Sequence, residues 1–451
     1  MSIDRNPVAA SAPLAPAASF RLLSAAGKSK LHHLDACVRA SSNGLMLIFV
    51  LLPALNALGA ARQSGTIPLG VLTPVSFGVF LLALAASFVT LSTKAIRGAP
   101  VFPRASSGVA IAGSLLIAWL ALREASTGNT GGARNYLLVL MTGLLLHAGR
   151  TSGFQPVIAF RFACRAAVLL SGILYVLYPT WYVNASDFFI DSGKIFSTVP
   201  NVQGIFGHPN YTGLFFSAVT LEEILVSAGR PVWRIFYGTS SAVILVMSQA
   251  RNANIGAILA LIIVGLIVHR RRTIVQALFF GGILLVASLP LLFSLPYFLS
   301  ATAPNFSALS LLGTRSSVWT AVDYFIARAP LFGGGSPAII AAHAIIVDPD
   351  VTDITHAHNL ELNILVSGGL VGLVMYFLTF VEAFRASLIR PQKSSLATGL
   401  LTVWAFSTFS ESPLTPYVTQ VGVVLYVVIG LLLVETVQAC PRVRRGSDGA
   451  S

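Results

Sequence analysis

The sequence predicts an all-α integral membrane protein. Hydrophobic residues make up 55% of its 451 residues and charged residues only 10%, whereas soluble domains carry roughly 25% charged residues. The mean hydropathy is +0.79. Apolar runs of about 20 residues, the length that crosses a bilayer as a helix, recur along the chain. Such a chain has too few polar residues to cover the surface of a soluble protein.

About twelve apolar runs are predicted to span the membrane. The fourth run is short for a complete span, and a long segment separates the ninth run from the tenth. An even number of spans places both termini on the same side of the membrane. The runs lie near residues 43–61, 70–92, 107–122, 135–148, 166–183, 211–228, 235–250, 253–268, 274–293, 361–384, 395–410 and 417–436.

The positions of the charged residues predict the orientation. With the loops assigned alternately to the two sides, 22 Lys and Arg fall on the side of the termini and seven on the other. The net charges are then +15 and −2, which together give the overall +13. Basic residues concentrate in cytoplasmic loops, so both termini are expected in the cytoplasm. The positive charge therefore reflects topology, and nucleic acid is not an expected partner.

The chain divides into five predicted segments. Residues 1–42, rich in Ala, Pro and Ser, suggest a disordered cytoplasmic tail, and residues 437–451 a basic cytoplasmic tail. Helices one to nine occupy 43–293, and helices ten to twelve occupy 361–436. The long outer loop 294–360 has apolar residues at helical spacing, which predicts one or more amphipathic helices against the membrane surface. No internal repeat supports a transporter built from duplicated halves.

Polar residues of four outer segments are candidates for a functional site. Asn210 opens the sixth span, Arg251 lies in the hairpin between the seventh and eighth, Arg315 opens a helix in the long loop, and His358 with Asn359 opens the tenth span. Arginine is scarce on this side, so Arg251 and Arg315 stand out. A cation in a first helical turn opposes the helix dipole, so Arg315 indicates a bound anion such as a phosphate.

Each candidate also has a purely structural explanation. Asn210 and Asn359 suit helix N-caps, the nearby His208 suits a turn before proline, and Arg251 suits an interfacial anchor. His358 is either an ordinary interfacial histidine or a general base, since a neutral imidazole accepts a proton near neutral pH. No set of carboxylates or thiolates with ligand spacing accompanies it, so no metal site is expected.

Two guanidinium groups and a histidine at one membrane face suggest a specific chemistry. Arg251 and Arg315 would hold a diphosphate at the level of the lipid headgroups, and His358 would deprotonate the hydroxyl that displaces it. This combination predicts glycosyl transfer from a lipid-diphosphate-linked sugar.

Several motifs resemble the O-antigen ligase and polymerase superfamily of bacterial envelope enzymes, over roughly residues 200–380. They are Phe-Gly-His-Pro-Asn at 206–210, Ser-Gln-Ala-Arg at 248–251, Gly-Thr-Arg-Ser-Ser-Val-Trp at 313–319, Pro-Leu-Phe-Gly-Gly-Gly at 330–335, and His-Asn at 358–359 followed by Gly-Gly at 368–369. Each motif alone is weak. Their order around one long outer loop is more specific.

The resemblance implies a GT-C-like, metal-independent, inverting glycosyltransferase of the bacterial inner membrane that needs no cofactor. Its donor would be an undecaprenyl-diphosphate-linked glycan, bound by Arg251 and Arg315, and His358 would activate the acceptor glycan. Asn210 and Asn359 would be positioning or capping residues. The active site would face the periplasm, and a chain-length regulator and a flippase would be partners.

Two activities within this resemblance remain open. The His-Pro-Asn motif favours an exopolysaccharide or O-antigen polymerase, and the alternative is a ligase that transfers the glycan to lipid A-core. A flippase or transporter for lipid-linked glycans is an alternative of a different class. Transporters usually place ionisable groups near the middle of the membrane, whereas here the polar residues gather at one face, which disfavours transport.

Overall fold

The computed structural model describes most of the chain, and the part described is mostly helical. The described residues are 25–60, 72–102, 108–177, 179–184, 201–226, 229–270, 281–282, 285, 288, 315–346, 357–389, 394–408, 411–412, 414–415 and 420–438.

The helices follow the apolar runs of the sequence. Two short strands, β1 (Val183–Asn184) and β2 (Asn201–Val202), pair antiparallel. Single turns of 3-10 helix, η3 and η5, cover Arg150–Ser152 and Gly204–Phe206. The α-helices are α1 (Ala25–Ala60), α2 (Leu72–Ile96), α3 (Gly108–Ser126), α4 (Thr130–Gly149), α5 (Pro156–Leu177), α6 (Pro179–Tyr182), α7 (Pro209–Leu225), α8 (Pro231–Met247), α9 (Arg251–Arg270), α12 (Arg315–Arg328), α13 (Gly335–Ile346), α14 (Leu360–Ile389), α15 (Ser395–Thr408) and α16 (Val421–Gln438).

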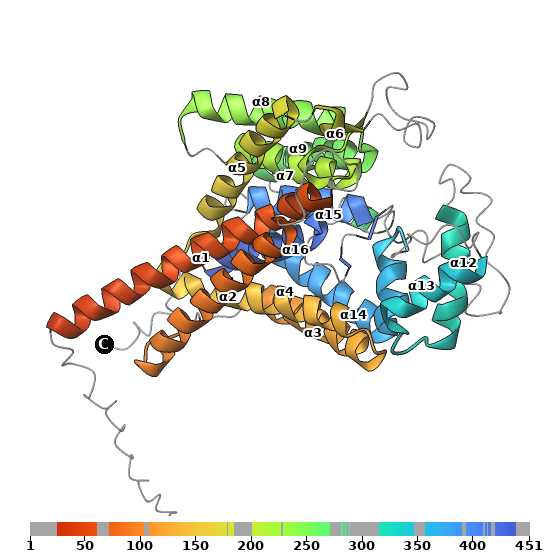
Figure 1. Ribbon diagram of the computed structural model, residues 1–451, viewed down its shortest axis with the longest axis horizontal. Coiled ribbons are helices and arrows are strands. Elements are labelled where there is room, and N and C mark those ends of the chain that lie inside the picture. The colour runs from red at the N-terminus through yellow and green to blue at the C-terminus, as the bar shows by residue number, and fades with distance from the viewer. Residues whose placement is uncertain are drawn as a thin grey trace, which may run out of the picture.

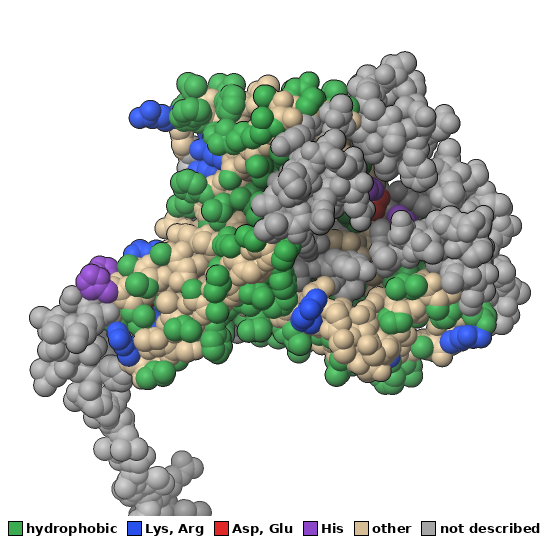
Figure 2. Space-filling view, in the orientation of Figure 1, with side chains coloured by type: hydrophobic (Ala, Val, Ile, Leu, Met, Phe, Trp, Pro, Cys, Tyr) green, Lys and Arg blue, Asp and Glu red, His purple; other side chains and the backbone are tan. Residues whose placement is uncertain are grey.

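Among the described residues, six helices are long and apolar enough to cross a membrane: α1, α2, α3, α5, α9 and α14. Shorter apolar helices are α8, α15 and α16. Hydrophobic side chains are spread over the whole of the visible helical surface, with few Lys and Arg among them (Figure 2). The protein is therefore an all-α, multi-pass membrane protein. The number of twelve spans stays a prediction, because most of the run near 274–293 lies outside the described residues.

The structure corrects two predicted boundaries. The cytoplasmic tail was expected to extend to residue 42, but α1 already begins at Ala25. This early part of α1 is held by tertiary contacts: Val38 is buried, and Asp35 pairs with Lys94 of α2 at 2.9 Å. The fifth span was expected near 166–183, whereas α5 runs from Pro156 to Leu177.

The shift of α5 has an electrostatic cause. Arg161 and Arg165 were assigned to the preceding loop, but both lie inside α5 and pair with carboxylates of α7. Arg161 Nε lies 2.5 Å from Glu222 Oε1, and Arg165 Nε lies 2.6 Å from Glu223 Oε1. Both glutamates are buried. Pairing lowers the cost of burying charge, so the helix continues through positions that hydropathy alone assigns to a loop.

In the described part of the long segment between α9 and α14 lie the helices α12 and α13, which pack on each other and on α14. The presence of helices in this segment is confirmed, whereas their position against the membrane surface stays a prediction. In Figure 1 this pair lies at the right of the molecule, beside α3 and α14, and the start of α1 lies at the opposite end. The helical bundle thus carries α12 and α13 at one end.

Candidate functional site

His358 lies directly before the N-terminus of α14, in a strained backbone conformation. Its φ is 50°, a left-handed value that non-glycine residues adopt uncommonly. The next residue, Asn359, is the N-cap of α14, because its Oδ1 accepts a hydrogen bond of 2.9 Å from the Leu362 backbone N–H. The capping role considered for Asn359 is therefore confirmed. The cap fixes the backbone directly after His358.

A carboxylate from the C-terminal part of the chain connects His358 to α7. Glu411 Oε2 lies 3.8 Å from His358 Nδ1, which is an ion-pair distance rather than a hydrogen bond. Glu411 Oε1 accepts a hydrogen bond of 2.7 Å from Asn210 Nδ2. Two of the predicted site residues, 148 positions apart in sequence, thus meet at one carboxylate.

The capping role considered for Asn210 is wrong. The N-cap of α7 is His208, whose Nδ1 accepts a hydrogen bond of 3.2 Å from the Asn210 backbone N–H. His208 is therefore a turn and capping residue, and its ring lies 5.0 Å from that of Tyr211. This arrangement leaves the Asn210 side chain directed at Glu411 rather than at its own helix.

The end of α15 and the residues after it hold the backbone around His358. Asn359 Nδ2 donates a hydrogen bond of 3.3 Å to the carbonyl oxygen of Thr408, and Ser412 Oγ donates one of 3.0 Å to the carbonyl oxygen of Asn359. Asn359 and Ser412 are buried. The segment that bears Glu411 is thus attached on both sides to the segment that bears His358.

Helix α12 reaches the same place from the long segment. Trp319 is fully buried, and its Nε1 donates a hydrogen bond of 2.9 Å to the carbonyl oxygen of Ala357, the residue before His358. Arg315 is the first residue of α12, one helical turn before Trp319. The structure therefore places the start of α12 beside the His358 segment, while the side chain of Arg315 lies outside the described residues.

Arg251 lies at the start of α9, which packs on α7. It is the first residue of α9 and is exposed. The preceding hairpin packs tightly on α7: a Cβ added to Gly213 would lie 2.4 Å from Ala250 Cβ. Gly213 is one turn beyond Asn210, so the hairpin and the Asn210–Glu411 contact share one end of α7. Arg251 thus lies at the end of the bundle where His358 lies.

A break in α14 anchors the long segment to this helix. Gly369 has φ 66° and ψ −167°, which interrupts the helix. The two following N–H groups turn to the loop after α12: Leu370 donates to Pro330 O at 2.8 Å and Val371 to Leu331 O at 3.2 Å. Backbone that leaves the helix inside a membrane protein needs such partners. The two glycine motifs of the sequence are therefore one packed unit.

The C-terminal end of α3 binds both glycine motifs. Arg123 Nη2 donates a hydrogen bond of 2.6 Å to Gly333 O, and Trp119 Nε1 donates one of 2.8 Å to Gly368 O. The buried carboxylate of Glu124 accepts from both the backbone N–H and the Oγ of Ser336, at 2.8 and 2.7 Å. An anion at the start of α13 also suits its helix dipole.

Sequence reasoning missed Glu411 as a site residue. It is an acidic residue near the end of a predicted span, with no motif around it, and its contacts with Asn210 and His358 bridge distant parts of the chain. Glu361, in the first turn of α14, is a second buried carboxylate close to His358 in sequence; its Oε1 accepts from Tyr376 Oη at 3.3 Å. Within the described ranges, no three His, Cys, Asp or Glu side chains group as metal ligands.

The fold and the site together define a multi-pass membrane protein with a polar centre at one end of its bundle, assembled around a long structured segment. Residues 237–377, about a third of the chain, match the family described as O-Antigen ligase. The match runs from α8 into α14 and includes Arg251, Arg315 and His358. It confirms the resemblance to the O-antigen ligase and polymerase superfamily. No curated protein matches the chain.

Proposed function

We propose that this protein transfers a glycan from an undecaprenyl-diphosphate-linked donor to a hydroxyl of an acceptor glycan, and that it polymerises exopolysaccharide or O-antigen repeat units. The match to the O-Antigen ligase family supports glycosyl transfer at a membrane. The observation that carries the residue assignment is the contact of Glu411 with both His358 and Asn210 at the start of α14.

His358 is the proposed general base. Its Nδ1 faces Glu411, so Nε2 is the nitrogen that would take the proton from the acceptor hydroxyl. A carboxylate beside one ring nitrogen fixes the tautomer and stabilises the imidazolium that forms, as in other carboxylate–histidine pairs. The 3.8 Å separation would shorten on substrate binding, since catalytic contacts are often long without substrate. Asn210 would in turn hold the Glu411 carboxylate in place.

The reaction balances without a redox partner. The acceptor oxygen would attack the anomeric carbon of the donor glycan from the face opposite the diphosphate. The new carbon–oxygen bond forms as the bond from that carbon to the diphosphate oxygen breaks, so the configuration inverts. The hydroxyl proton moves to His358 and then to solvent, and undecaprenyl diphosphate leaves with the bonding electrons.

Arg251 and Arg315 are proposed to bind the diphosphate. Negative charge grows on the leaving oxygen in the transition state, and fixed cations placed there lower the barrier. Arginine suits this role because its planar fork binds phosphate oxygens in a bidentate manner. Each arginine begins a helix, α9 or α12, where backbone N–H groups also favour an anion. The N-termini of α9 and α12 would then bind the four nonbridging oxygens of the same diphosphate.

The charge distribution supports a site on the periplasmic side of the bacterial inner membrane. The residues proposed for the site lie in segments assigned to the outer, less basic side. A flippase would have to deliver the donor to that side, and a chain-length regulator would act on the polymer. The His-Pro-Asn motif at 208–210 favours polymerase over ligase.

The test is an assay of the purified protein in defined vesicles with a lipid-diphosphate-linked repeat unit and a metal chelator. Longer lipid-linked glycans would support the polymerase. Product that forms only when lipid A-core is added would replace it with the ligase. Movement of the donor across the vesicle membrane without any new glycosidic bond would overturn the proposal in favour of a flippase.

A further inference from the structure

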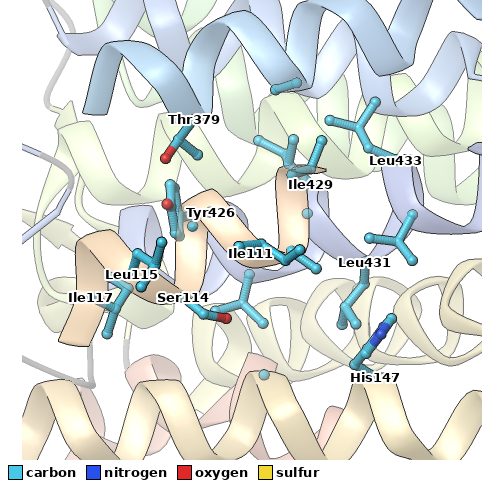
Figure 3. Close-up of a pocket in the computed structure, with 18 of the residues that line it drawn as sticks. Ile111, Ser114, Leu115, Ile117, His147, Thr379, Tyr426, Ile429, Leu431 and Leu433 are labelled. Atoms are coloured by element: carbon cyan, nitrogen blue, oxygen red, sulfur yellow. The ribbon is translucent and has the colours of Figure 1, made fainter. Parts of the chain in front are cut away.

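An apolar cavity of about 570 Å³ is lined by residues of α3, α4, α14, α15 and α16. Figure 3 shows its walls, which are mostly aliphatic. On α14 the cavity is lined by residues from Tyr376 to Ala383, beyond the break at Gly369, and Tyr376 also donates a hydrogen bond to Glu361 in the first turn of α14. At its other end the cavity is lined by Phe102 and His147, whose rings lie 6.2 Å apart. These residues are close in the sequence to Arg97 and Arg150, which belong to the side that carries most of the basic residues.

The cavity opens toward the hydrophobic surface of the bundle. Ile111 and Leu115 line it and are 51% and 54% exposed. Such side chains would face lipid tails in a membrane. Gly430 also lines the cavity, and a Cβ added there would meet no atom within 4 Å. A site with walls of this kind offers water too few polar partners, and it suits a hydrocarbon chain that enters from the bilayer.

Polar side chains lie at or next to one end of the cavity. His147 lines it, is 7% exposed, and its Nδ1 has no hydrogen-bond partner among the described residues. Arg150 follows one turn later, and Glu435 follows the lining residue Val434. Arg150 Nη1 and Glu435 Oε2 are likewise buried without a hydrogen-bond partner in the described part of the chain. Arg150 directly follows α4 and Glu435 lies on α16, and these two helices pack on each other.

These polar groups carry both signs of charge. An imidazole and a guanidinium can donate to a phosphate, and a carboxylate can accept from an ammonium group. A headgroup that joins a phosphate to a primary ammonium complements all three. Buried polar atoms without partners are costly and call for an explanation, and a bound headgroup of this composition supplies one.

We propose that this cavity is a binding site for a phospholipid of the phosphatidylethanolamine class from the cytoplasmic leaflet. One acyl chain would fill the space between α3, α4, α14 and α16. The phosphate would bind at His147 and Arg150, and the ammonium group at Glu435. None of the residues proposed for glycosyl transfer lines the cavity, and lipid binding is measured without transfer activity, so the proposal is tested independently of that function.

Quenching of Trp404 fluorescence tests the site, because Trp404 lines the cavity and is only 3% exposed. The protein is reconstituted in phosphatidylcholine vesicles that contain a small fraction of phosphatidylethanolamine brominated along its acyl chain. Bromine quenches a nearby indole. The Trp404 signal is the difference between the wild-type chain and Trp404→Phe, each measured with and without the brominated lipid.

We expect the quenching of Trp404 to saturate as the fraction of brominated lipid rises. The mole fraction that gives half of the maximal quenching should be at least about fivefold lower for brominated phosphatidylethanolamine than for brominated phosphatidylcholine. This factor corresponds to about one net hydrogen bond. Gly430→Leu, which fills the cavity, should abolish the quenching. The control Gly172→Leu, whose added Cβ also meets no atom within 4 Å, should leave it unchanged. Glu435→Gln and Arg150→Gln should remove the preference between the two lipids.

Three results would overturn the proposal. One is quenching that rises in proportion to the bromolipid fraction and equally for both headgroups. Another is quenching that survives Gly430→Leu. The third is saturable quenching by a brominated polyprenyl phosphate but not by brominated phosphatidylethanolamine, which would assign the cavity to a prenyl chain.

Discussion

Trp319 donates a hydrogen bond of 2.9 Å from Nε1 to the carbonyl oxygen of Ala357. This contact joins α12, which begins with Arg315, to the residue that precedes His358. The Ala357 N–H donates in turn to Asn363 Oδ1 at 3.2 Å, so both backbone groups of this residue are bound. The buried indole of Trp319 thus fixes the position of His358, the proposed base, relative to the start of α12, where Arg315 is proposed to bind the diphosphate.

Trp319→Phe is expected to keep the aromatic packing and lose this hydrogen bond. A buried carbonyl left without its partner costs roughly 1–3 kcal/mol, and the His358 backbone would lose part of its restraint. We expect polymer formation to fall severalfold while the protein remains inserted, measured as lipid-linked product per amount of membrane-bound protein. The control is Trp233→Phe in α8, a half-exposed tryptophan. Equal activity of the two variants would contradict the role of the contact.

Glu411→Gln tests the orientation of His358. The amide can still accept the hydrogen bond from Asn210 but no longer stabilises an imidazolium. Since proton transfer by a positioned base contributes 10²- to 10⁴-fold, kcat is expected to fall at least about tenfold with little change in KM for the donor. Glu411→Asp should retain more activity than Glu411→Gln. The matched control is Glu382→Gln, at the far end of α14. A change confined to KM would indicate substrate binding instead.

Arg251 is expected to act through the geometry of its guanidinium as well as its charge. Arg251→Ala should reduce glycan transfer about 100-fold, the usual cost of removing a group that stabilises charge in a transition state. Arg251→Lys should recover little of this loss, because an ammonium group cannot bind two oxygens as a planar fork. Arg328→Lys, at the end of α12, serves as control. Full activity of Arg251→Lys would show that charge alone suffices.

Gly369→Ala is expected to destabilise the protein. Alanine is strained at φ 66°, and its Cβ would lie 2.3 Å from the carbonyl carbon of Leu331. Strain of this kind costs of order 1–3 kcal/mol before any clash. The midpoint of thermal unfolding in detergent should therefore drop by several degrees. Gly265→Ala in α9, where an added Cβ meets no atom within 4 Å, should leave the midpoint unchanged or raise it.

Much of the helical fold follows from hydropathy, because apolar runs of spanning length become helices wherever lipid surrounds them. The boundaries that hydropathy misplaced depend on pairing. Arg161 and Arg165 lie inside α5 because they pair with Glu222 and Glu223. Hydropathy along the chain does not reveal such a partner, which lies about 60 positions away. The same holds for the early start of α1, which the Asp35–Lys94 pair supports.

Only part of the candidate site could be predicted from the sequence, again because some of its residues act through contacts with distant parts of the chain. His358 and Asn359 could be identified because they stand at the start of an apolar run, where polar residues are conspicuous. Glu411 could not, since its importance comes from distant contacts with His358 and Asn210. The sequence could not assign the role of Asn210, because asparagine at the start of a helix suggests an N-cap. Only the structure shows that His208 is the N-cap of α7.

The most direct test of the central claim is release of undecaprenyl diphosphate from a purified donor in the presence of acceptor and a metal chelator. It is measured for the wild-type chain, His358→Ala and the control His33→Ala, whose histidine is exposed on α1. We predict release for the wild type and His33→Ala, with donor binding but no release above background for His358→Ala. Release by His358→Ala at the wild-type rate would contradict the assignment of His358 as the general base.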